Sequence, residues 1–393
     1  MTIKITGGLP LKGEISPKGS VFSSLAILSC SLMIRGRVFL ENVPRVSKVT
    51  LFLETLKPFG ISYDWVAKNS LALEVSDVSN SLITNPLLLI PILIRFGEAT
   101  VKKGVIADPD KKFLETLGAT FTDSKNPNIQ LVLLAKPKSL DVNLENLLSR
   151  SFSALLFFSG AALEATLNNF LMTEELGELL NFLKSAGFIS ECNQVDSNLK
   201  IRGGSGSLVA DVSFRLSPSV LETAFWATAA IVSGGDILIK DVSRARLVPF
   251  LSKLTLLGCT FEFDGGSLRV WRDLTKTISP IDINVSRNSL LYDFLPMFVV
   301  LMLFADGASH ITDVNLEQEP YFKDLNLFNA RITGSEVVGP CQLRGCRVAL
   351  PDFTSGLALF LAAFGSTTKS EILEVEKVSG FFDEFENNLN ILL

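Results

Sequence analysis

A unit of about 66 residues recurs along this chain, and the repetition limits the folds available to it. Residues 36–45 (GRVFLENVPR) resemble residues 235–244 (GDILIKDVSR), and each segment continues into an amphipathic stretch that ends at a glycine, Gly60 or Gly258. Weaker copies share a small residue between an apolar stretch and a short strand, at Gly36, Gly97, Ala165, Gly235, Gly307 and Gly365. Six such units fill the chain, which predicts a repeated architecture.

The apolar stretches that precede the small residues predict buried central helices. They are apolar nearly all round, as expected of helices enclosed by other elements, and span residues 20–34, 82–96, 149–163, 218–233, 289–305 and 352–364. Each unit adds a second helix with a polar face, such as residues 174–186, which we expect on the outside. Alternating strands and helices of this kind predict an α/β fold.

The last unit is incomplete, because the chain ends at Leu393 without the closing strands that the other units have. The strand expected at residues 2–6 belongs to no complete unit, so we expect it to join the last one. The sequence thus predicts two lobes of three repeats each. The first lobe would hold residues 20–213, and the second would hold residues 1–19 together with 214–393.

Composition argues against several classes of function. The uncharged runs at residues 20–34 and 81–94 are shorter than the roughly 18 to 20 residues of a membrane-spanning helix. The net charge of -5 disfavours nucleic acid as a partner. A single histidine, His310, argues against zinc and against Ser/His/Asp catalysis, so we expect neither metal nor cofactor. Five irregularly spaced cysteines and the absence of a leader-like start indicate the cytoplasm.

The segments that open the central helices are the candidate binding residues. If these helices begin at the same end of each lobe, their free N–H groups and dipoles favour an anion such as phosphate. Lys18 and the segment Ser149-Arg150-Ser151 lie at two such entries of the first lobe. The two cations could bind phosphate, or they could be solvated surface groups.

Asp293 is a second kind of candidate. It lies inside the apolar stretch of residues 290–298, where a carboxylate is costly without a partner or an open cleft. We therefore favour a functional role for Asp293 over a purely structural hydrogen bond. We expect it to face a cleft between the lobes, opposite Lys18 on the other lobe.

Several segments resemble those of the enolpyruvyl transferase family, which moves the enolpyruvyl group of phosphoenolpyruvate to UDP-N-acetylglucosamine or to 3-phosphoshikimate. The matching segments are residues 13–16, 23–28, 41–44, 95–97, 114–119, 221–224 and 292–293, and residues 149–156 are similar to the serine-rich helix entry of the phosphoshikimate branch. The resemblance implies inside-out α/β barrels, two closing lobes and a site between them. It also implies Asp293 as catalytic residue, and Ser149 and Asn315 in the substrate site.

The chain departs from this family at most of the implied cations. The family's Lys-Asn pair falls on Val21 and Phe22, with Lys18 as the nearby cation. The loop that carries the family's cysteine and an arginine is shortened to residues 102–110 and has neither. Arginines implied elsewhere fall on Glu319, on Thr354 and within residues 378–380. These losses remove groups that would hold phosphate and carboxylate.

Three hypotheses follow. In the first, the chain transfers the enolpyruvyl group to the 3-hydroxyl of UDP-N-acetylglucosamine, with Asp293 as base and Lys18 in place of the lost lysine. In the second, the acceptor is shikimate 3-phosphate. In the third, a non-catalytic member keeps the scaffold to bind a ligand or partner. The sequence gives no oligomeric state.

Overall fold

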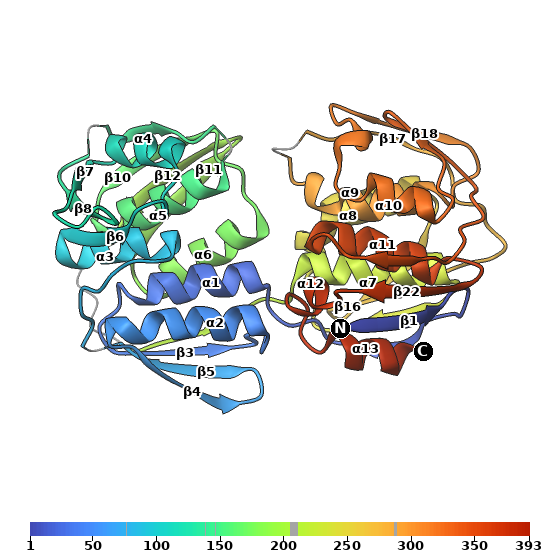
Figure 1. Cartoon of the computed structure of the whole chain (residues 1–393), viewed down its shortest axis with the longest axis horizontal. Coiled ribbons are helices and arrows are strands. Elements are labelled where there is room, and N and C mark those ends of the chain that lie inside the picture. Colours follow the sequence, from blue (N-terminus) through green and yellow to red (C-terminus); the bar gives the residue numbers. More distant parts are fainter. Residues whose placement is uncertain (76, 138, 146, 205–210, 287–288) are drawn as a thin grey trace. The chain divides into compact units, whose positions relative to one another are not determined.

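The structure is a computed structural model that describes residues 1–75, 77–137, 139–145, 147–204, 211–286 and 289–393. The chain divides into two compact units, one of Met1–Ser20 with Pro218–Leu393 and one of Val21–Ser217. Within the described ranges the strands form six small sheets, three in each unit (Figure 1). The molecule is therefore mixed α/β.

The unit Val21–Ser217 contains the sheets β13-β3-β5-β4, β6-β8-β7 and β11-β12-β10-β9. Its strands are β3 Arg37–Glu41, β4 Ser62–Ala67, β5 Ser70–Glu74, β6 Glu98–Lys102, β7 Ala119–Asp123, β8 Ile129–Leu134, β9 Asp141–Asn143, β10 Glu164–Asn168, β11 Ile189–Val195, β12 Asn198–Gly203 and β13 Val212–Arg215. Its helices are α1 Val21–Ser31, α2 Ser47–Leu56, η1 Lys57–Phe59, η2 Pro86–Leu88, α3 Leu89–Phe96, α4 Asp108–Thr116, α5 Leu148–Gly160 and α6 Glu174–Ser185.

The unit of Met1–Ser20 with Pro218–Leu393 contains the sheets β1-β22-β21, β15-β16-β14-β2 and β17-β18-β20-β19. Its strands are β1 Thr2–Thr6, β2 Lys12–Ile15, β14 Asp236–Ile239, β15 Thr260–Asp264, β16 Ser267–Trp271, β17 Asp282–Asn284, β18 Ala308–Thr312, β19 Ile332–Thr333, β20 Glu336–Val338, β21 Arg347–Ala349 and β22 Lys369–Leu373. Its helices are α7 Val220–Ser233, α8 Arg244–Leu256, η3 Tyr292–Phe294, α9 Leu295–Met302, η4 Leu316–Gln318, α10 Phe322–Leu327, α11 Phe353–Phe364, α12 Glu376–Ser379 and α13 Phe385–Leu392.

The core of this second unit is built by α7, α9 and α11, which pack against one another (Figure 1). Nearly all of their side chains are buried, which explains why they are apolar on every face. Phe225 of α7 joins them to the C-terminal segment, because its ring centroid lies 5.5 Å from that of Phe382 and 6.0 Å from that of Phe385.

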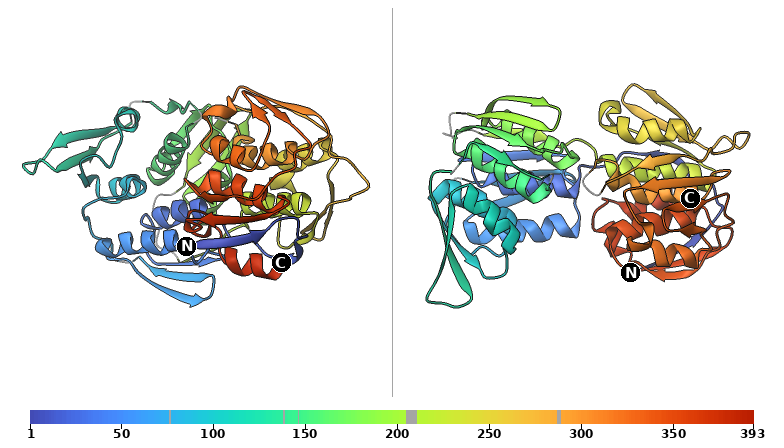
Figure 2. Two further views of the ribbon diagram at one scale, coloured as in Figure 1. Left: turned by 45° about the vertical axis from the view of Figure 1, so that its right-hand side comes forward. Right: turned by 90° about the horizontal axis from the view of Figure 1, so that it is seen from above.

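The N-terminal strand lies with the end of the chain. β1 runs antiparallel to β22, and Ile3 faces Ile372 in the register, so the blue first strand and the red last strand are neighbours (Figure 2). At the junction of the units, β13 extends past the boundary expected after residue 213, because Phe214 and Arg215 pair with Leu40 and Glu41 of β3. The division therefore falls after Ser217.

All six central helices are shorter than the apolar stretches that predicted them, and two of them, α3 and α9, begin several residues late. The stretch 82–96 begins with Ile83 bridged to Val101 and becomes α-helical only at Leu89, after Asn85 caps a short 3-10 turn at Pro86. The stretch 289–305 becomes α-helical at Leu295, next to Pro296. Proline disfavours helical backbone in the residue before it and fits best in a first turn, so each helix starts near its proline.

Candidate functional site

A cavity of about 500 Å³ lies in the unit Val21–Ser217, where several helices begin. Its wall comes from the N-terminal halves of α1, α5 and α6, from η2 and the start of α3, and from α4 with the loop that precedes it. The lining residues are Phe22, Leu25, Ala26, Pro86, Leu87, Leu89, Ile90, Val105, Ile106, Ala107, Asp110, Leu114, Leu148, Ser149, Phe152, Ser153, Glu175 and Leu176. Of the helix-entry candidates named from the sequence, Ser149 is the one that lines this cavity.

The cavity is apolar and its charged groups are acidic. Its polar lining residues are Asp110, Ser149, Ser153 and Glu175, and among the described residues of the wall there is no lysine, arginine or histidine. Phe22, which occupies an implied Lys-Asn position, contributes an aromatic side chain to the wall instead. Free N–H groups at helix starts favour anions, but two carboxylates in apolar surroundings oppose them.

Ser149 lines this cavity and connects two of its helices. Its Oγ donates a hydrogen bond of 3.0 Å to Oδ1 of Asp110, which joins the start of α5 to the first turn of α4. Both helices lack side-chain caps, because Ala107 and Leu147 occupy their N-cap positions. Ser149 is thus a wall residue whose hydroxyl orients a carboxylate.

Arg150 and Ser151 are not among the lining residues. Arg150 Nη1 lies 2.8 Å from Glu145 Oε1, and its guanidinium carbon lies 5.5 Å from the ring centroid of Phe113. Only 15% of the Arg150 side chain is exposed, and its buried Nε has no hydrogen-bond partner within the described part of the chain. Ser151 is buried one residue further into α5. The cation expected to bind phosphate is therefore held by a carboxylate and an aromatic ring.

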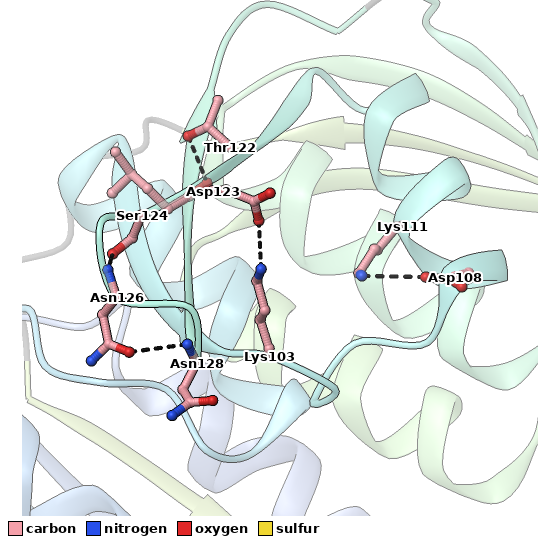
Figure 3. Close-up of polar contacts among 9 residues, drawn as sticks. Lys103, Asp108, Lys111, Thr122, Asp123, Ser124, Asn126 and Asn128 are labelled. Carbon is pink, nitrogen blue, oxygen red and sulfur yellow. Dashed lines mark hydrogen bonds and ion pairs between the residues drawn. The ribbon is translucent and has the colours of Figure 1, made fainter.

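Two lysines of the segment from β6 to α4, Lys103 and Lys111, are also paired (Figure 3). Lys103 Nζ lies 2.8 Å from Asp123 Oδ1, and Lys111 Nζ lies 3.2 Å from Asp108 Oδ1. The hydrogen bond from Lys103 is the main cause that holds the pKa of the Asp123 carboxyl below its usual value. Neither lysine lines the cavity.

Lys18 and Asp293 belong to the same unit, which corrects the expectation that they lie on different lobes. The backbone explains the placement of Lys18: its carbonyl accepts a hydrogen bond of 2.8 Å from Ser219 N, and Gly19 bridges Pro218. The chain leaves this unit only after Ser20. A movement of one unit relative to the other would therefore not change the distance between Lys18 and Asp293.

Asp293 is exposed, so the cost of burial inferred from its apolar neighbours does not apply to it. It sits in the 3-10 turn η3, which turns its side chain outward while Phe294 turns into the core. Asn315 has a local role, because its Oδ1 accepts a hydrogen bond of 3.0 Å from Glu317 N and caps the turn η4.

A buried carboxylate, that of Glu319, is bound by Tyr292 of the η3 turn. The sequence did not predict this contact. Glu319 is 5% exposed, and the Tyr292 hydroxyl donates to it, 2.9 Å from Oε2 and 3.2 Å from Oε1. The hydroxyl of Tyr321 is buried without a described hydrogen-bond partner. Burial, and then the charge of Glu319, raise the pKa of Tyr321 well above its usual value. The only sequence signal was a glutamate where the family resemblance implies an arginine.

More negative charge lies near the start of α11. Burial, and then the charge of Asp352, raise the pKa of Asp324. Asp352 caps α11, since its Oδ1 accepts a hydrogen bond of 2.7 Å from Ser355 N. Within the described residues, no group of three or more histidine, cysteine, aspartate or glutamate side chains is arranged to hold a metal ion.

We expect two of the five free thiols, Cys259 and Cys346, to react slowly with iodoacetamide in the folded protein. Burial raises the pKa of Cys259 to about 12 and that of Cys346 to about 11, so little thiolate exists at pH 8. Labelling should be ~100-fold or more slower than in the urea-unfolded chain and should accelerate as pH rises. Timed labelling with peptide mass spectrometry measures this, and equal rates in both states would contradict it.

Helix lengths in the described residues also bear on the membrane question: none of these helices is both long and apolar enough to cross a bilayer.

Two solved structures share this fold across essentially the whole chain. The enolpyruvyl transferase NikO from Streptomyces tendae superposes with a TM-score of 0.86 at 16% identity, covering 99% of this chain and 96% of that one. EPSP synthase from Acinetobacter baumannii superposes with a TM-score of 0.76 at 13% identity, covering 100% and 98%. At these identities the likeness concerns the fold.

Sequence relatives extend over nearly the same length. The UDP-N-acetylglucosamine 1-carboxyvinyltransferase of Dichelobacter nodosus is 25% identical over 414 aligned positions, covering 95% of this chain and 94% of that protein. The enzyme of the same name from Chlorobium chlorochromatii is 27% identical over 412 positions, covering 99% and 96%.

The family model of EPSP synthase (3-phosphoshikimate 1-carboxyvinyltransferase) matches residues 111–389, well over half of the chain. The resemblance found in the short sequence segments is thereby confirmed. The chain belongs to the EPSP synthase family, within the superfamily that transfers the enolpyruvyl group of phosphoenolpyruvate.

Proposed function

We propose that this chain binds a ligand on an enolpyruvyl-transferase scaffold and does not turn over phosphoenolpyruvate. One observation carries the proposal: Glu319, where the family resemblance implies an arginine, is a buried carboxylate bound by Tyr292. Phosphoenolpyruvate brings a phosphate and a carboxylate, and both need cations or preorganised donors. The apolar Val21 and Phe22 and the held Arg150 support the same reading.

The second candidate is enolpyruvyl transfer to the 3-hydroxyl of UDP-N-acetylglucosamine, a step of peptidoglycan precursor synthesis in the cytoplasm. It is favoured by the relatives named UDP-N-acetylglucosamine 1-carboxyvinyltransferase, which align with nearly the whole chain. Asp293 would take the hydroxyl proton, Lys18 would bind phosphate, and Ser149 and Asn315 would contact the acceptor. Shikimate 3-phosphate is the alternative acceptor, supported by the description of the matching family.

We expect the purified full chain to release no inorganic phosphate from phosphoenolpyruvate with either UDP-N-acetylglucosamine or shikimate 3-phosphate. The reason is the missing positive charge, since stabilising charge that develops in the reaction is usually the largest catalytic contribution. A coupled phosphate assay at saturating concentrations of both substrates measures the rate. The Dichelobacter nodosus enzyme verifies the reagents of the UDP-N-acetylglucosamine assay, and the Acinetobacter baumannii EPSP synthase verifies those of the shikimate 3-phosphate assay.

Phosphate release above the blank with one acceptor would reject the proposal and identify that acceptor. Asp293→Asn should then abolish release, because it removes the base while keeping the size of the side chain. Asp264→Asn, which changes another exposed aspartate of the same unit at the end of β15, should leave release unchanged.

We also propose that the six sheets and their helices are copies of one repeat, three in each lobe. The recurring small residues and the three sheets in each unit support this arrangement.

A further inference from the structure

The cavity of the unit Val21–Ser217 offers two kinds of contact. Most of its wall is aliphatic or aromatic, and its ionisable lining residues are Asp110 and Glu175. Such a cavity stabilises an apolar body, and it repels an anion through like charge in poorly solvated surroundings. Its volume of about 500 Å³ lies in the range of small-molecule sites.

We propose that this cavity binds a small ligand with an apolar or aromatic body and a protonated amine. This deepens the proposed function, on which it rests, by naming a class of ligand for the scaffold. The body would occupy the apolar wall, and the ammonium group would donate charge-assisted hydrogen bonds to the carboxylates. The ligand class therefore differs in charge from the phosphate-bearing substrates of the second candidate function.

The carboxylates are held by local structure. Asp110 is half-buried in the first turn of α4, and its Oδ1 accepts the hydrogen bond from Ser149. An ionised carboxylate has about four acceptor positions, so Asp110 can also accept from a ligand. Glu175 is half-buried in the first turn of α6.

Two large apolar side chains of the wall are incompletely covered. Phe22 is 43% exposed and Leu148 is 47% exposed, although both line the cavity. They stand at the starts of α1 and α5. An apolar ligand body would remove this surface from water, which provides a driving force independent of the carboxylates.

Three probes of similar shape test the proposal on the full chain: 2-phenylethylamine, 2-phenylethanol and 3-phenylpropanoate. We expect the amine to bind ~10-fold or more tightly than the alcohol, because a charge-assisted hydrogen bond is roughly twice as strong as a neutral one. We expect no measurable binding of the carboxylate. Titration at 0.15 M salt, followed by ligand-observed NMR, gives the three affinities.

Matched variants locate the site. Asp110→Asn should cost the amine ~10-fold in affinity and leave the alcohol unchanged. Asp108→Asn changes an exposed aspartate of the same helical turn that pairs with Lys111 outside the wall, and it should change neither affinity. Glu175→Gln and its neighbour Glu174→Gln form a second pair of the same design, should Asp110→Asn fail to fold.

The proposal is overturned if no probe binds, if 3-phenylpropanoate binds as tightly as the amine, or if both variants of each pair lower amine affinity equally. Amine binding and phosphate release are separate measurements. If phosphate is released and the amine does not bind, both proposals are rejected. If no phosphate is released and the amine does not bind, only the amine site is rejected.

Discussion

Gly235→Ala is expected to destabilise the unit of Met1–Ser20 with Pro218–Leu393 by at least ~3 kcal/mol. A Cβ added at Gly235 would lie 2.0 Å from Leu11 O and 2.8 Å from Leu11 N. These are backbone atoms next to the parallel pairing of β2 with β14, and Leu11 O accepts a hydrogen bond from Asp236 N. The methyl group can be accommodated only if the strands separate. Urea unfolding followed by circular dichroism gives the change in free energy.

The neighbouring glycine is the control. Gly234 has φ +75°, and no described atom lies within 4 Å of a Cβ built there. Gly234→Ala should therefore cost only about 1 kcal/mol, the price of a left-handed backbone without glycine. Equal effects of the two substitutions would show that backbone conformation, and not the close approach to Leu11, sets the need for glycine.

The repeat pattern located such positions without giving their cause. Gly97 occupies the equivalent place in another unit, yet it has φ +75° and open space around it. At Gly365 a Cβ would lie 2.3 Å from the ring of Phe304. The sequence pattern shows that a small residue recurs. A close approach of other atoms and a left-handed backbone both favour glycine, so the pattern does not distinguish them. Only the three-dimensional contacts separate the two causes.

Much of the fold follows from local patterns. The alternation of apolar helices with short strands predicted a mixed α/β chain, and prolines that interrupt an apolar stretch explain the helices that begin late, as at Leu295. Periodicity reports on burial along one segment. It does not show where a 3-10 turn precedes an α-helix that begins near a proline. Apolar stretches therefore overestimate the length of the α-helix.

The candidate site was less predictable because long side chains choose partners that periodicity does not encode. Ser149 could be singled out as a helix-entry residue, and it does line the cavity. Its neighbour Arg150 turns instead to Glu145, and Asp293 faces solvent despite its apolar neighbours. Asp110 could not be chosen from the sequence, because an acidic residue in a first helical turn is common on any surface.

Arg95→Met is expected to destabilise the unit Val21–Ser217 by about 2 to 4 kcal/mol. Arg95 belongs to one of the segments that resemble the family, residues 95–97. In the structure its guanidinium donates hydrogen bonds to backbone carbonyls. Nη1 donates to the carbonyls of Leu32 at 2.8 Å and Ile34 at 2.7 Å, just beyond the end of α1, and Nη2 donates to Val75 at 3.4 Å. Methionine fills similar space without donors, so the carbonyls of the buried Leu32 and Ile34 would lose this partner.

A substitution of the neighbouring cation Arg35 is the control that distinguishes this structural role from a general effect of removing charge. Arg35 is exposed, and its positive charge contributes, after burial, to lowering the pKa of Arg95. Arg35→Met should therefore change the free energy of unfolding by less than about 0.5 kcal/mol. Arg95→Lys should recover only part of the loss, because one ammonium group cannot reproduce a planar fork that reaches three carbonyls. If Arg95→Met unfolds at the same urea concentration as the unmodified chain, the guanidinium does not stabilise the end of α1. Arg95 would then be available as a ligand-binding cation.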